Sequence, residues 1–227
     1  RVIADAAHQL KTPLAGLRMQ AELAQRENSP EELQRSLEQI ADSSTRATRL
    51  VQQLLSLARM ENTNKLSEKI LIDLSQSAAD ATKNWLSAAW EKNIDLGYQS
   101  NQPSHKMYGN PVMLKELFNN LLDNAIKYTP NNGSVTVDVR KADQPGLLIV
   151  EVKDTGPGIP PEERQRVLER FYRVLGSDIE GSGLGLAIVK EIATQHGGKL
   201  EILENIYQDS PLKYGTCMRV YLPVGTP

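Results

Sequence analysis

The sequence has little cysteine, few aromatic residues and no long apolar run. Cys217 is the single cysteine, so no disulfide can form within the chain, and a small buried thiol is the expected state. No segment reaches the roughly 20 consecutive apolar residues that a membrane-spanning helix needs. Aromatic residues make up 5% of the chain and do not interleave with blocks of lysine and arginine, which argues against a nucleic-acid partner.

The residues that are present suit a two-domain globular protein. The chain has 227 residues, 40% of them hydrophobic, which is enough for at least one sizeable core. Its 26 basic and 28 acidic residues give a net charge of -2, and this balance indicates no particular partner. The first residue is Arg1 rather than methionine, so we expect a fragment whose N-terminal neighbour, such as a membrane anchor, is missing.

The first part of the chain predicts two long amphipathic helices. Apolar residues alternate at spacings of four and three in the first helix, and the second helix keeps the same alternation except for a polar Ser44. The first stripe comprises Ile3, Ala7, Leu10, Leu14, Leu17, Ala21 and Ala24. The second comprises Leu33, Leu37, Ile40, Ala47, Val51, Leu54 and Ala58.

A clear signal separates the two helices. Ser29 is placed as an N-cap, Pro30 at the first helical position and Glu32 at the capping-box position. A hairpin with one apolar stripe per helix cannot cover itself, so we expect a homodimer in which two hairpins form a four-helix bundle.

His8 lies beside the apolar stripe of the first helix rather than on it. Its ring should therefore be open to solvent, with Thr12 one turn further on the same face and Pro13 bending the helix just beyond. A lone histidine on a helix is more often an ordinary surface residue. The residues around it are needed to decide between the two interpretations.

A polar connector divides the chain. We expect a helical hairpin over residues 1–61, a linker over 62–69 and a second domain over 70–227. In the second domain, Ser75 should cap a helix running to about Lys92, with Trp85 and Trp90 as packing residues. Strands are predicted over 70–73, 94–98, 105–108, 135–140, 147–153, 199–203 and 218–222. They predict an α+β sandwich, a mostly antiparallel sheet with helices on one face.

The helix predicted over 111–128 has a polar face of unusual composition. Asn120, Asn124 and Lys127 share it, opposite an apolar side. Asparagine is a poor helix former that gains little at an exposed mid-helix position. Amide oxygens suit Mg²⁺ and a nearby lysine suits phosphate, although a simple solvated face would also explain the pattern.

Two glycine-containing segments follow this helix. Asp154-Thr155-Gly156-Pro157-Gly158-Ile159 closes a strand with a sharp turn. Gly181-Ser182-Gly183-Leu184-Gly185-Leu186 opens a helix, where bare N–H groups and the helix dipole form an anion site. The segment between them has the length of a lid. His105 and His196 lie outside these segments and are expected at the surface or in turns.

The segment from His8 to Leu14, HQLKTPL, resembles the phosphoacceptor segment of sensor histidine kinases, the two-component family. Five further segments resemble, in order and spacing, the nucleotide-binding boxes of that family's catalytic domain. They are NLLDNAIKY (120–128), DTGPGI (154–159), RFYR (170–173), GSGLGL (181–186) and YGT (214–216). This catalytic fold is shared with type II topoisomerase, chaperone and mismatch-repair ATPases.

The resemblance implies a role for each matching residue. His8 would be the phosphoacceptor, and Arg173 would meet the γ-phosphate of ATP. Thr12 would orient a water that dephosphorylates the partner protein of such kinases, the response regulator. Asn124, helped by Asn120, would hold Mg²⁺. The remaining nucleotide-binding residues would be Lys127, Tyr128, Asp154, Gly156, Gly158, Ile159, Gly181, Ser182, Gly183, Leu184, Gly185 and Thr216.

The implied function is that of a cytoplasmic kinase core from a bacterial inner-membrane protein. His8 would be phosphorylated from Mg-ATP and would pass the phosphoryl group to an aspartate of a response regulator. The family has an acidic residue where this sequence has Gln9, which has no comparable basicity. Three alternatives stay open: a degenerate kinase acting as a dimeric scaffold, an ATPase of the same nucleotide fold, and a phosphatase directed at the regulator.

Overall fold

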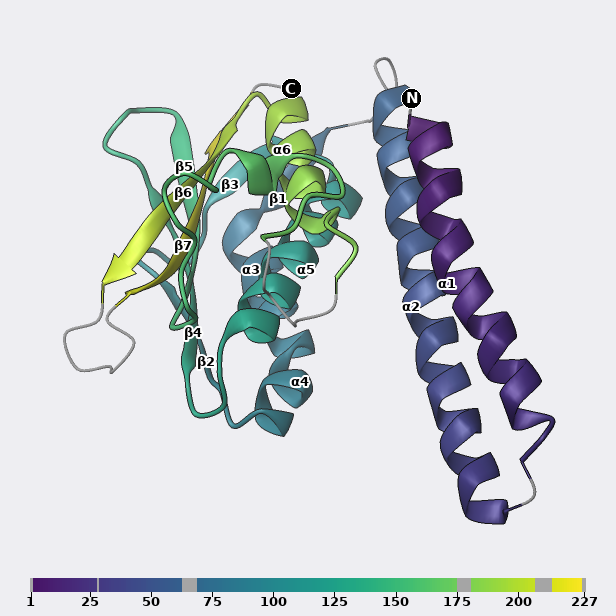
Figure 1. Cartoon of the computed structure of the whole chain (residues 1–227). Helices are drawn as coiled ribbons and strands as arrows, with labels where there is room; N and C mark the ends of the chain where they lie inside the picture. Colours follow the sequence, from purple (N-terminus) through teal and green to yellow (C-terminus); the bar gives the residue numbers. More distant parts are fainter. Residues whose placement is uncertain (1, 28, 63–68, 175–180, 207–213, 226–227) are drawn as a thin grey trace. The chain divides into compact units, whose positions relative to one another are not determined.

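The computed structural model describes residues 2–27, 29–62, 69–174, 181–206 and 214–225. The chain divides into two compact units, Arg1–Asn64 and Lys65–Pro227, which are described separately (Figure 1). Among the described residues, no helix combines the length and apolar character that crossing a bilayer requires.

The first unit is a helical hairpin. Helix α1 spans Val2–Ala24 and continues through Pro13, and α2 spans Pro30–Asn62. The predicted start of α2 is confirmed, because the Ser29 hydroxyl oxygen accepts from the backbone N–H of Glu32 at 3.5 Å. That hydroxyl donates to the carboxylate of Glu31 at 2.8 Å, so the acid that pairs with the cap is one residue earlier than the capping-box position.

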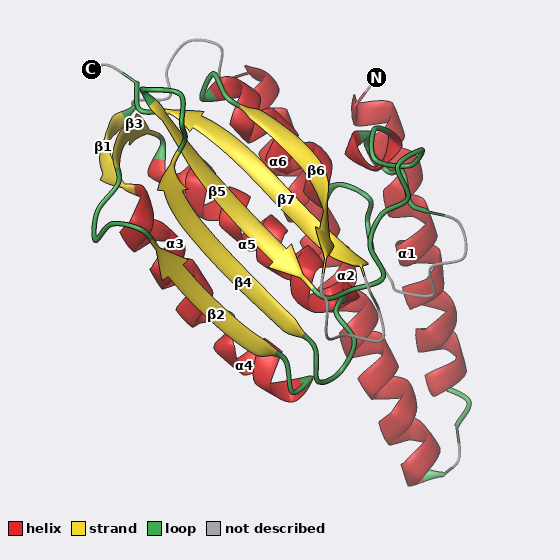
Figure 2. Ribbon diagram, turned by 90° about the vertical axis from the view of Figure 1, so that its left-hand side faces the viewer, coloured by secondary structure: helices red, strands yellow, loops and turns green. Residues whose placement is uncertain are grey.

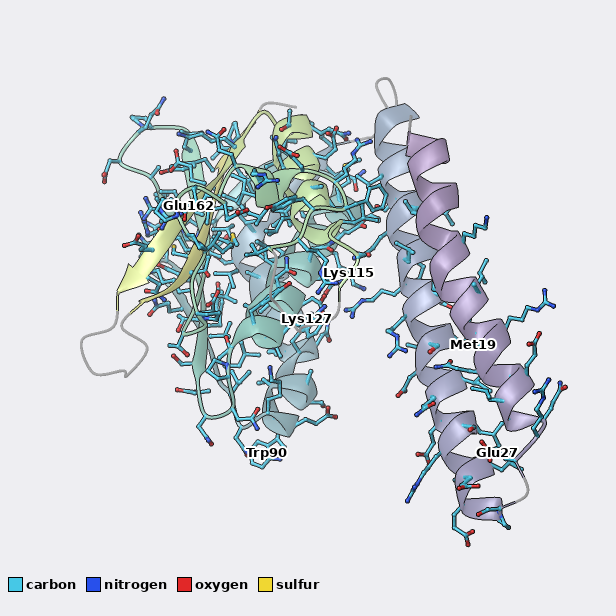
Figure 3. The ribbon with its side chains drawn as sticks, viewed as in Figure 1. Met19, Glu27, Trp90, Lys115, Lys127 and Glu162 are labelled. Atoms are coloured by element: carbon cyan, nitrogen blue, oxygen red, sulfur yellow. The ribbon has the colours of Figure 1, made fainter. Side chains whose placement is uncertain are left out.

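The hairpin leaves much of its apolar surface uncovered. Small and branched residues are buried where the helices meet, among them Ala24, Ala47, Leu54 and Leu57. Among the hairpin's described side chains, seven larger apolar ones remain exposed: Leu14, Met19, Leu23, Leu33, Leu37, Val51 and Leu55. Met19 is among the side chains labelled on the hairpin in Figure 3. Two helices alone therefore do not bury the predicted stripes.

The second unit contains a five-stranded sheet of order β2-β4-β5-β7-β6. Its strands are β2 (Asp95–Ser100), β4 (Ser134–Lys141), β5 (Leu147–Asp154), β6 (Lys199–Ile206) and β7 (Tyr214–Pro223). Only β2 and β4 pair in parallel; the other three pairings are antiparallel. A separate two-stranded sheet joins β1 (Ile70–Asp73) to β3 (Lys106–Gly109).

The helices cover one face of the five-stranded sheet (Figure 2). They are α3 (Leu74–Asn84), α4 (Leu86–Glu91), α5 (Pro111–Tyr128) and α6 (Gly185–Gln195). The sheet's inner rows are apolar: Val137 and Val152 pair in one row, and Val139 and Val150 in the next. The predicted α+β layer with helices on one face is confirmed.

The long helix predicted from Ser75 to Lys92 is wrong in two respects. Asp73 is the N-cap, since its carboxylate accepts from the backbone N–H groups of Ser75 and Gln76. The helix also breaks at Trp85, whose ψ of 0° separates α3 from α4. The two tryptophans differ as well: Trp85 is half-buried, whereas Trp90 is 83% exposed and is not a packing residue (Figure 3).

The sheet face opposite the helices carries a charged network. Glu151, at the centre of β5, is only 2% exposed. It forms ion pairs with Arg140 on β4 at 2.8 Å, with Lys153 at 2.7 Å, and with Arg219 on β7 at 2.5 Å. Asp138 lies directly across from Glu151 on β4 and within 4 Å of two of these cations. Three cations therefore compensate the buried carboxylate.

His105 and His196 are both buried, so the predicted surface position is wrong for both, although His196 does lie in a turn, as the prediction allowed. His105 places its Nδ1 2.7 Å from the Ser75 hydroxyl. His196 ends α6, and its Nε2 accepts from the backbone N–H of Asn110 at 3.1 Å. Its Nδ1 therefore carries the proton and donates to the carbonyl of Ile192 at 2.8 Å. The neutral ring thus links the end of α6 to the start of α5, and burial lowers its pKa.

Candidate functional site

Helix α5 presents the polar face that the sequence predicts. Asn110 caps it by accepting from the backbone N–H groups of Val112 and Met113 at 2.9 and 3.0 Å, and Pro111 occupies the first turn. Leu114, Leu117, Phe118, Leu121 and Leu122 are fully buried on the side that packs into the unit. The cap and this apolar side fix the rotation of the helix, and hence the direction of its asparagines.

The two asparagines face the start of α6. A β-carbon placed at Gly185 would lie 3.3 Å from both Asn120 Oδ1 and Asn124 Nδ2, so the absence of a side chain there lets the two helices approach. Asn124 Nδ2 is buried without a hydrogen-bond partner among the described residues. A buried amide left unsatisfied in this way costs free energy unless a ligand or water completes it. The pair therefore fits a polar ligand such as a metal-bound phosphate.

Lys127 lies at the other end of the asparagine face, against the glycine loop. Its Nζ is 2.9 Å from the place that a β-carbon of Gly181 would occupy. Gly183 has a φ of +70°, and a side chain there would collide with the backbone of Phe171. The N–H of Phe171 donates to the Gly183 carbonyl at 2.9 Å. Phe171 has a φ of +64° itself, so two left-handed residues hold the lid segment onto the loop.

The start of α6 has backbone N–H groups available in the same place. Ser182 accepts from the N–H of Leu184 at 3.2 Å, and Leu184 is fully buried at the N-cap position. The N-cap residue itself, Leu184, has no side-chain acceptor for the N–H groups of the first turn. The N-terminal dipole of this helix therefore points toward Lys127 and the asparagines, where it favours an anion.

Asp154 ends β5 and is 5% exposed. Its Oδ1 accepts from the backbone N–H groups of Gly156 at 2.9 Å and Thr216 at 3.2 Å. Burial raises the pKa of this carboxyl to about 6, although these hydrogen bonds and one from the Thr216 side chain act in the opposite direction. The second carboxylate oxygen can accept from a ligand, which makes Asp154 a suitable partner for a donor such as an exocyclic amino group.

The turn after Asp154 meets the end of α5. A β-carbon at Gly156 would lie 2.9 Å from the carbonyl oxygen of Tyr128, and Gly158 adopts a left-handed φ of +76°. Arg164 donates from Nε to the Ile159 carbonyl at 3.1 Å and forms an ion pair with Glu204 on β6. The turn is thus held at both ends.

Asn205 is a supporting residue that sequence reasoning missed. Its side-chain amide donates to the carbonyl oxygen of Asp154 at 3.1 Å. Between them on β7 lies Gly215, where a β-carbon would be 1.8 Å from that same oxygen. The role of Asn205 follows from its pairing with Gly215 across strands β6 and β7, and the sequence does not show this register.

Arg173 is the last candidate in the second unit. It is exposed, and its positive charge acts on the hydroxyl of Tyr128, whose pKa is nevertheless raised by burial. His8, Gln9 and Thr12 lie on the backbone of α1, and their side chains fall outside the described residues. The structure thus brings together the candidates of the second unit and leaves those of the hairpin as predictions.

These residues form one continuous set. A buried acceptor, Asp154, lies at one end, and two amides, a lysine and a helix N-terminus lie at the other. The carbonyl of Tyr128 joins the two ends. Such a set can hold a ligand with an amino-bearing ring and a polyphosphate chain.

Comparison with known families assigns both units. Residues 1–63 match the His Kinase A (phospho-acceptor) domain. Residues 109–226 match the family described as histidine kinase-, DNA gyrase B- and HSP90-like ATPase. The chain belongs to the histidine kinase family.

Relatives of this histidine kinase include sensor proteins. Sensor protein QseC of Salmonella typhi is 40% identical over 198 residues, which cover 87% of this chain and 43% of that protein. The signal transduction histidine-protein kinase/phosphatase MprB of Mycolicibacterium paratuberculosis is 36% identical over 235 residues, covering 98% of this chain and 42% of the relative. The chain therefore spans less than half the length of these relatives.

A solved structure extends the similarity to the whole fold. The histidine kinase ThkA in complex with the response regulator protein TrrA superposes with a TM-score of 0.75 over 98% of this chain and 61% of that one, at 21% identity. At this level of identity the likeness shows the fold alone.

Proposed function

We propose that the protein is the kinase core of a two-component sensor, which phosphorylates His8 from ATP and passes the phosphoryl group to an aspartate of a response regulator. The bond between the γ-phosphorus and its bridging oxygen would break, ADP would leave, and a phosphorus–nitrogen bond to the imidazole would form. The contacts that link Asp154, Lys127 and the two asparagines through Tyr128 and the glycine segments support this most strongly.

Each residue group has a part in this proposal. Asp154 would accept a hydrogen bond from the adenine amino group, while Gly156, Gly158 and Ile159 shape the base pocket. Lys127 and the N–H groups of the glycine loop would bind phosphate oxygens, and Arg173 would meet the γ-phosphate.

The asparagine pair would hold a magnesium ion. Amide oxygens are hard ligands that suit Mg²⁺. The amide nitrogen of Asn124, which has no hydrogen-bond partner among the described residues, would donate to an oxygen of the bound phosphate. When bound, this ion would neutralise charge on the phosphates. Titrating Mg²⁺ into the chain with and without ATP, and comparing Asn124→Ala, tests the assignment.

Labelling with ATP that carries a radioactive γ-phosphate tests the central proposal. We expect wild-type protein to become labelled, with a label that is lost in acid and kept in base, as a phosphohistidine requires. His8→Ala should abolish the label while retaining nucleotide binding, and Asn124→Ala should lose both. A label that survives His8→Ala, or that resists acid, would contradict the proposal.

Gln9 favours a second candidate, a degenerate kinase that binds nucleotide and acts as a scaffold. Its amide cannot take the imidazole proton as a carboxylate would. Gln9→Glu separates the two functions. A kinase limited by this residue should label faster with glutamate, by about 10-fold or more, whereas a scaffold should bind ATP and remain unlabelled in both forms.

Phosphatase activity is a further proposal, supported by Thr12 and by MprB, the relative named as a kinase/phosphatase. A phosphorylated response regulator should lose its label faster in the presence of this protein, and Thr12→Ala should remove that acceleration without reducing labelling of His8. Equal decay with and without the protein would exclude it.

We also propose that the hairpin forms a homodimer. The exposed leucines of α1 and α2 support this, because a partner hairpin would bury them. Sedimentation equilibrium should give twice the mass of one chain, and Leu37→Glu should shift it toward the monomer. The location expected from the sequence, the cytoplasmic side of a bacterial inner membrane, stays a prediction.

A further inference from the structure

Lys92, the residue that ends α4, extends its side chain to the end of α5. Its ammonium donates to the backbone carbonyl oxygens of Ile126 at 2.8 Å, Lys127 at 3.1 Å and Thr129 at 2.7 Å. An ammonium has three N–H groups, so each has an acceptor. The backbone carbonyl of Lys92 also accepts from the N–H of Asn132 at 3.3 Å. One residue therefore ties the whole turn at the end of α5.

These carbonyls need an external partner. The last four carbonyls of a helix have no N–H within it, and they carry the negative end of the helix dipole. Thr129 satisfies the carbonyl of Ala125 with its N–H and its hydroxyl, at 3.0 and 2.6 Å. The ammonium of Lys92 donates to the next two carbonyls, those of Ile126 and Lys127. Burial lowers the pKa of Lys92, and among the described residues it forms no ion pair, so backbone dipoles alone compensate its charge.

The turn that Lys92 holds touches both loops of the nucleotide site. The carbonyl of Tyr128 lies 2.9 Å from the β-carbon position of Gly156, and Lys127 Nζ lies 2.9 Å from that of Gly181. Movement of this turn would therefore shift Lys127 relative to the glycine loop. Figure 3 shows Lys127 on α5, toward the end that Lys92 ties.

We propose that Lys92 is a positioning residue of the nucleotide site, whose ammonium fixes the last turn of α5 and thereby holds Lys127 in place for phosphate. This inference rests on the proposed binding of ATP phosphates by Lys127. Lys92 touches no substrate itself. If it served only the general stability of the unit, its loss would affect every part of the site equally.

Three variants of the full chain separate these cases. Lys92→Met keeps the unbranched apolar stem of the side chain and removes the ammonium, and Lys92→Arg keeps a donating cation. Lys83→Met removes an exposed lysine of α3 as the matched control. Calorimetry with Mg-ATP and with adenosine measures phosphate and base binding separately.

For Lys92→Met we expect Mg-ATP to bind about tenfold more weakly and adenosine to change by less than about twofold. Lys92→Arg should recover part of the loss, and Lys83→Met should match wild type. On a Lys127→Met background, adding Lys92→Met should cause no further loss of Mg-ATP affinity, because the effect acts through Lys127. Equal weakening of both ligands, or additive losses in the double variant, would overturn the inference.

Hydrogen exchange of the ligand-free protein tests whether Lys92 fixes the last turn of α5. In Lys92→Met the amide of Thr129 should exchange faster, while that of Ile188, which donates to Leu184 in α6, should exchange as in wild type. Uniformly faster exchange would overturn the inference. Wild-type protein that binds no Mg-ATP, or Lys127→Met that binds it normally, would instead refute the proposed function of the site.

Discussion

Asp154 should make the nucleotide-free protein less stable at neutral pH than a neutral side chain would. Its carboxyl has a pKa of about 6, against an ordinary value of 3.8, and this difference corresponds to about 3 kcal/mol. Because the folded-state pKa is the higher one, the group's stabilising contribution is complete below pH 3.8 and is lost as the pH rises through about 6. At neutral pH the buried carboxylate is therefore ionised, and without a ligand this ionisation lowers the free energy of unfolding.

Asp154→Asn removes this ionisation and keeps an oxygen that can accept from Gly156 and Thr216. We expect its free energy of unfolding to exceed that of wild type by about 1–3 kcal/mol near pH 7.5, with the difference shrinking as the pH falls through about 6 and reaching about zero below pH 3.8. ATP affinity should fall in the variant, since an amide N–H would face the adenine amino group. In wild type, affinity should fall as the pH drops below about 6, because a protonated carboxyl is a weaker acceptor.

Urea unfolding followed by tryptophan fluorescence measures the first effect. The chain has two tryptophans, Trp85 and Trp90, and both lie in the second unit. Trp85 is half-buried and its indole N–H donates to Asn119, so its emission should change on unfolding. Asp80→Asn, at an exposed carboxylate of α3, is the control and should follow wild type at both pH values. A variant at Asp154 that is less stable than wild type at neutral pH, or equally stabilised at low pH, would refute the reasoning.

Three further substitutions test the packing around the site by the same unfolding measurement. Gly215→Ala should destabilise the fold by about 1–3 kcal/mol and weaken ATP binding, because its β-carbon would collide with the last carbonyl of β5. Gly97→Ala is the control: nothing lies within 4 Å of the added β-carbon, so stability should change by less than about 0.5 kcal/mol. Similar effects of the two substitutions would contradict the contact at Gly215. Glu151→Gln should cost about 1–3 kcal/mol, since it removes the carboxylate that pairs with Arg219 and leaves Asp138 as the acid paired with Arg140 and Lys153. Glu204→Gln, in a more exposed ion pair, should cost less than about 0.5 kcal/mol. Equal losses would be the contrary result. His196→Ala should cost about 2–4 kcal/mol, because it leaves a cavity and removes the ring nitrogen that accepts from the backbone N–H of Asn110. In wild type the neutral ring's contribution should be present above pH 6.5 and lost as the pH falls through its lowered pKa. A variant as stable as wild type would show that this bridge is unimportant.

Local chemistry made much of this fold predictable. Ser29 caps a helix as expected, and the strands follow from alternating apolar residues. The polar face of α5 was visible because asparagine is unusual in mid-helix. These features depend on neighbours in sequence, where spacing carries the information.

Features that depend on distant residues were not predictable. The break at Trp85 has no glycine or proline to mark it, and the contact of its indole with Asn119 comes from another helix. His196 is polar and follows a helix, so its burial arises only because α5 begins beside it. In the sequence Lys92 resembles an ordinary surface lysine, because only the tertiary structure brings the end of α5 next to it. In each case tertiary structure supplies the partner.

The charged network on the open sheet face has a consequence for how this sequence can diverge. Its members stand on three neighbouring strands and compensate one another across the ladder, while Val150 and Val152 face the helices instead. If an acidic and a basic residue on paired strands changed places together, the charge balance would be preserved and the apolar layer beneath the nucleotide site would be unchanged. Related proteins should therefore vary at these positions in correlated pairs, and the face should accept a dye or an affinity label without loss of nucleotide binding.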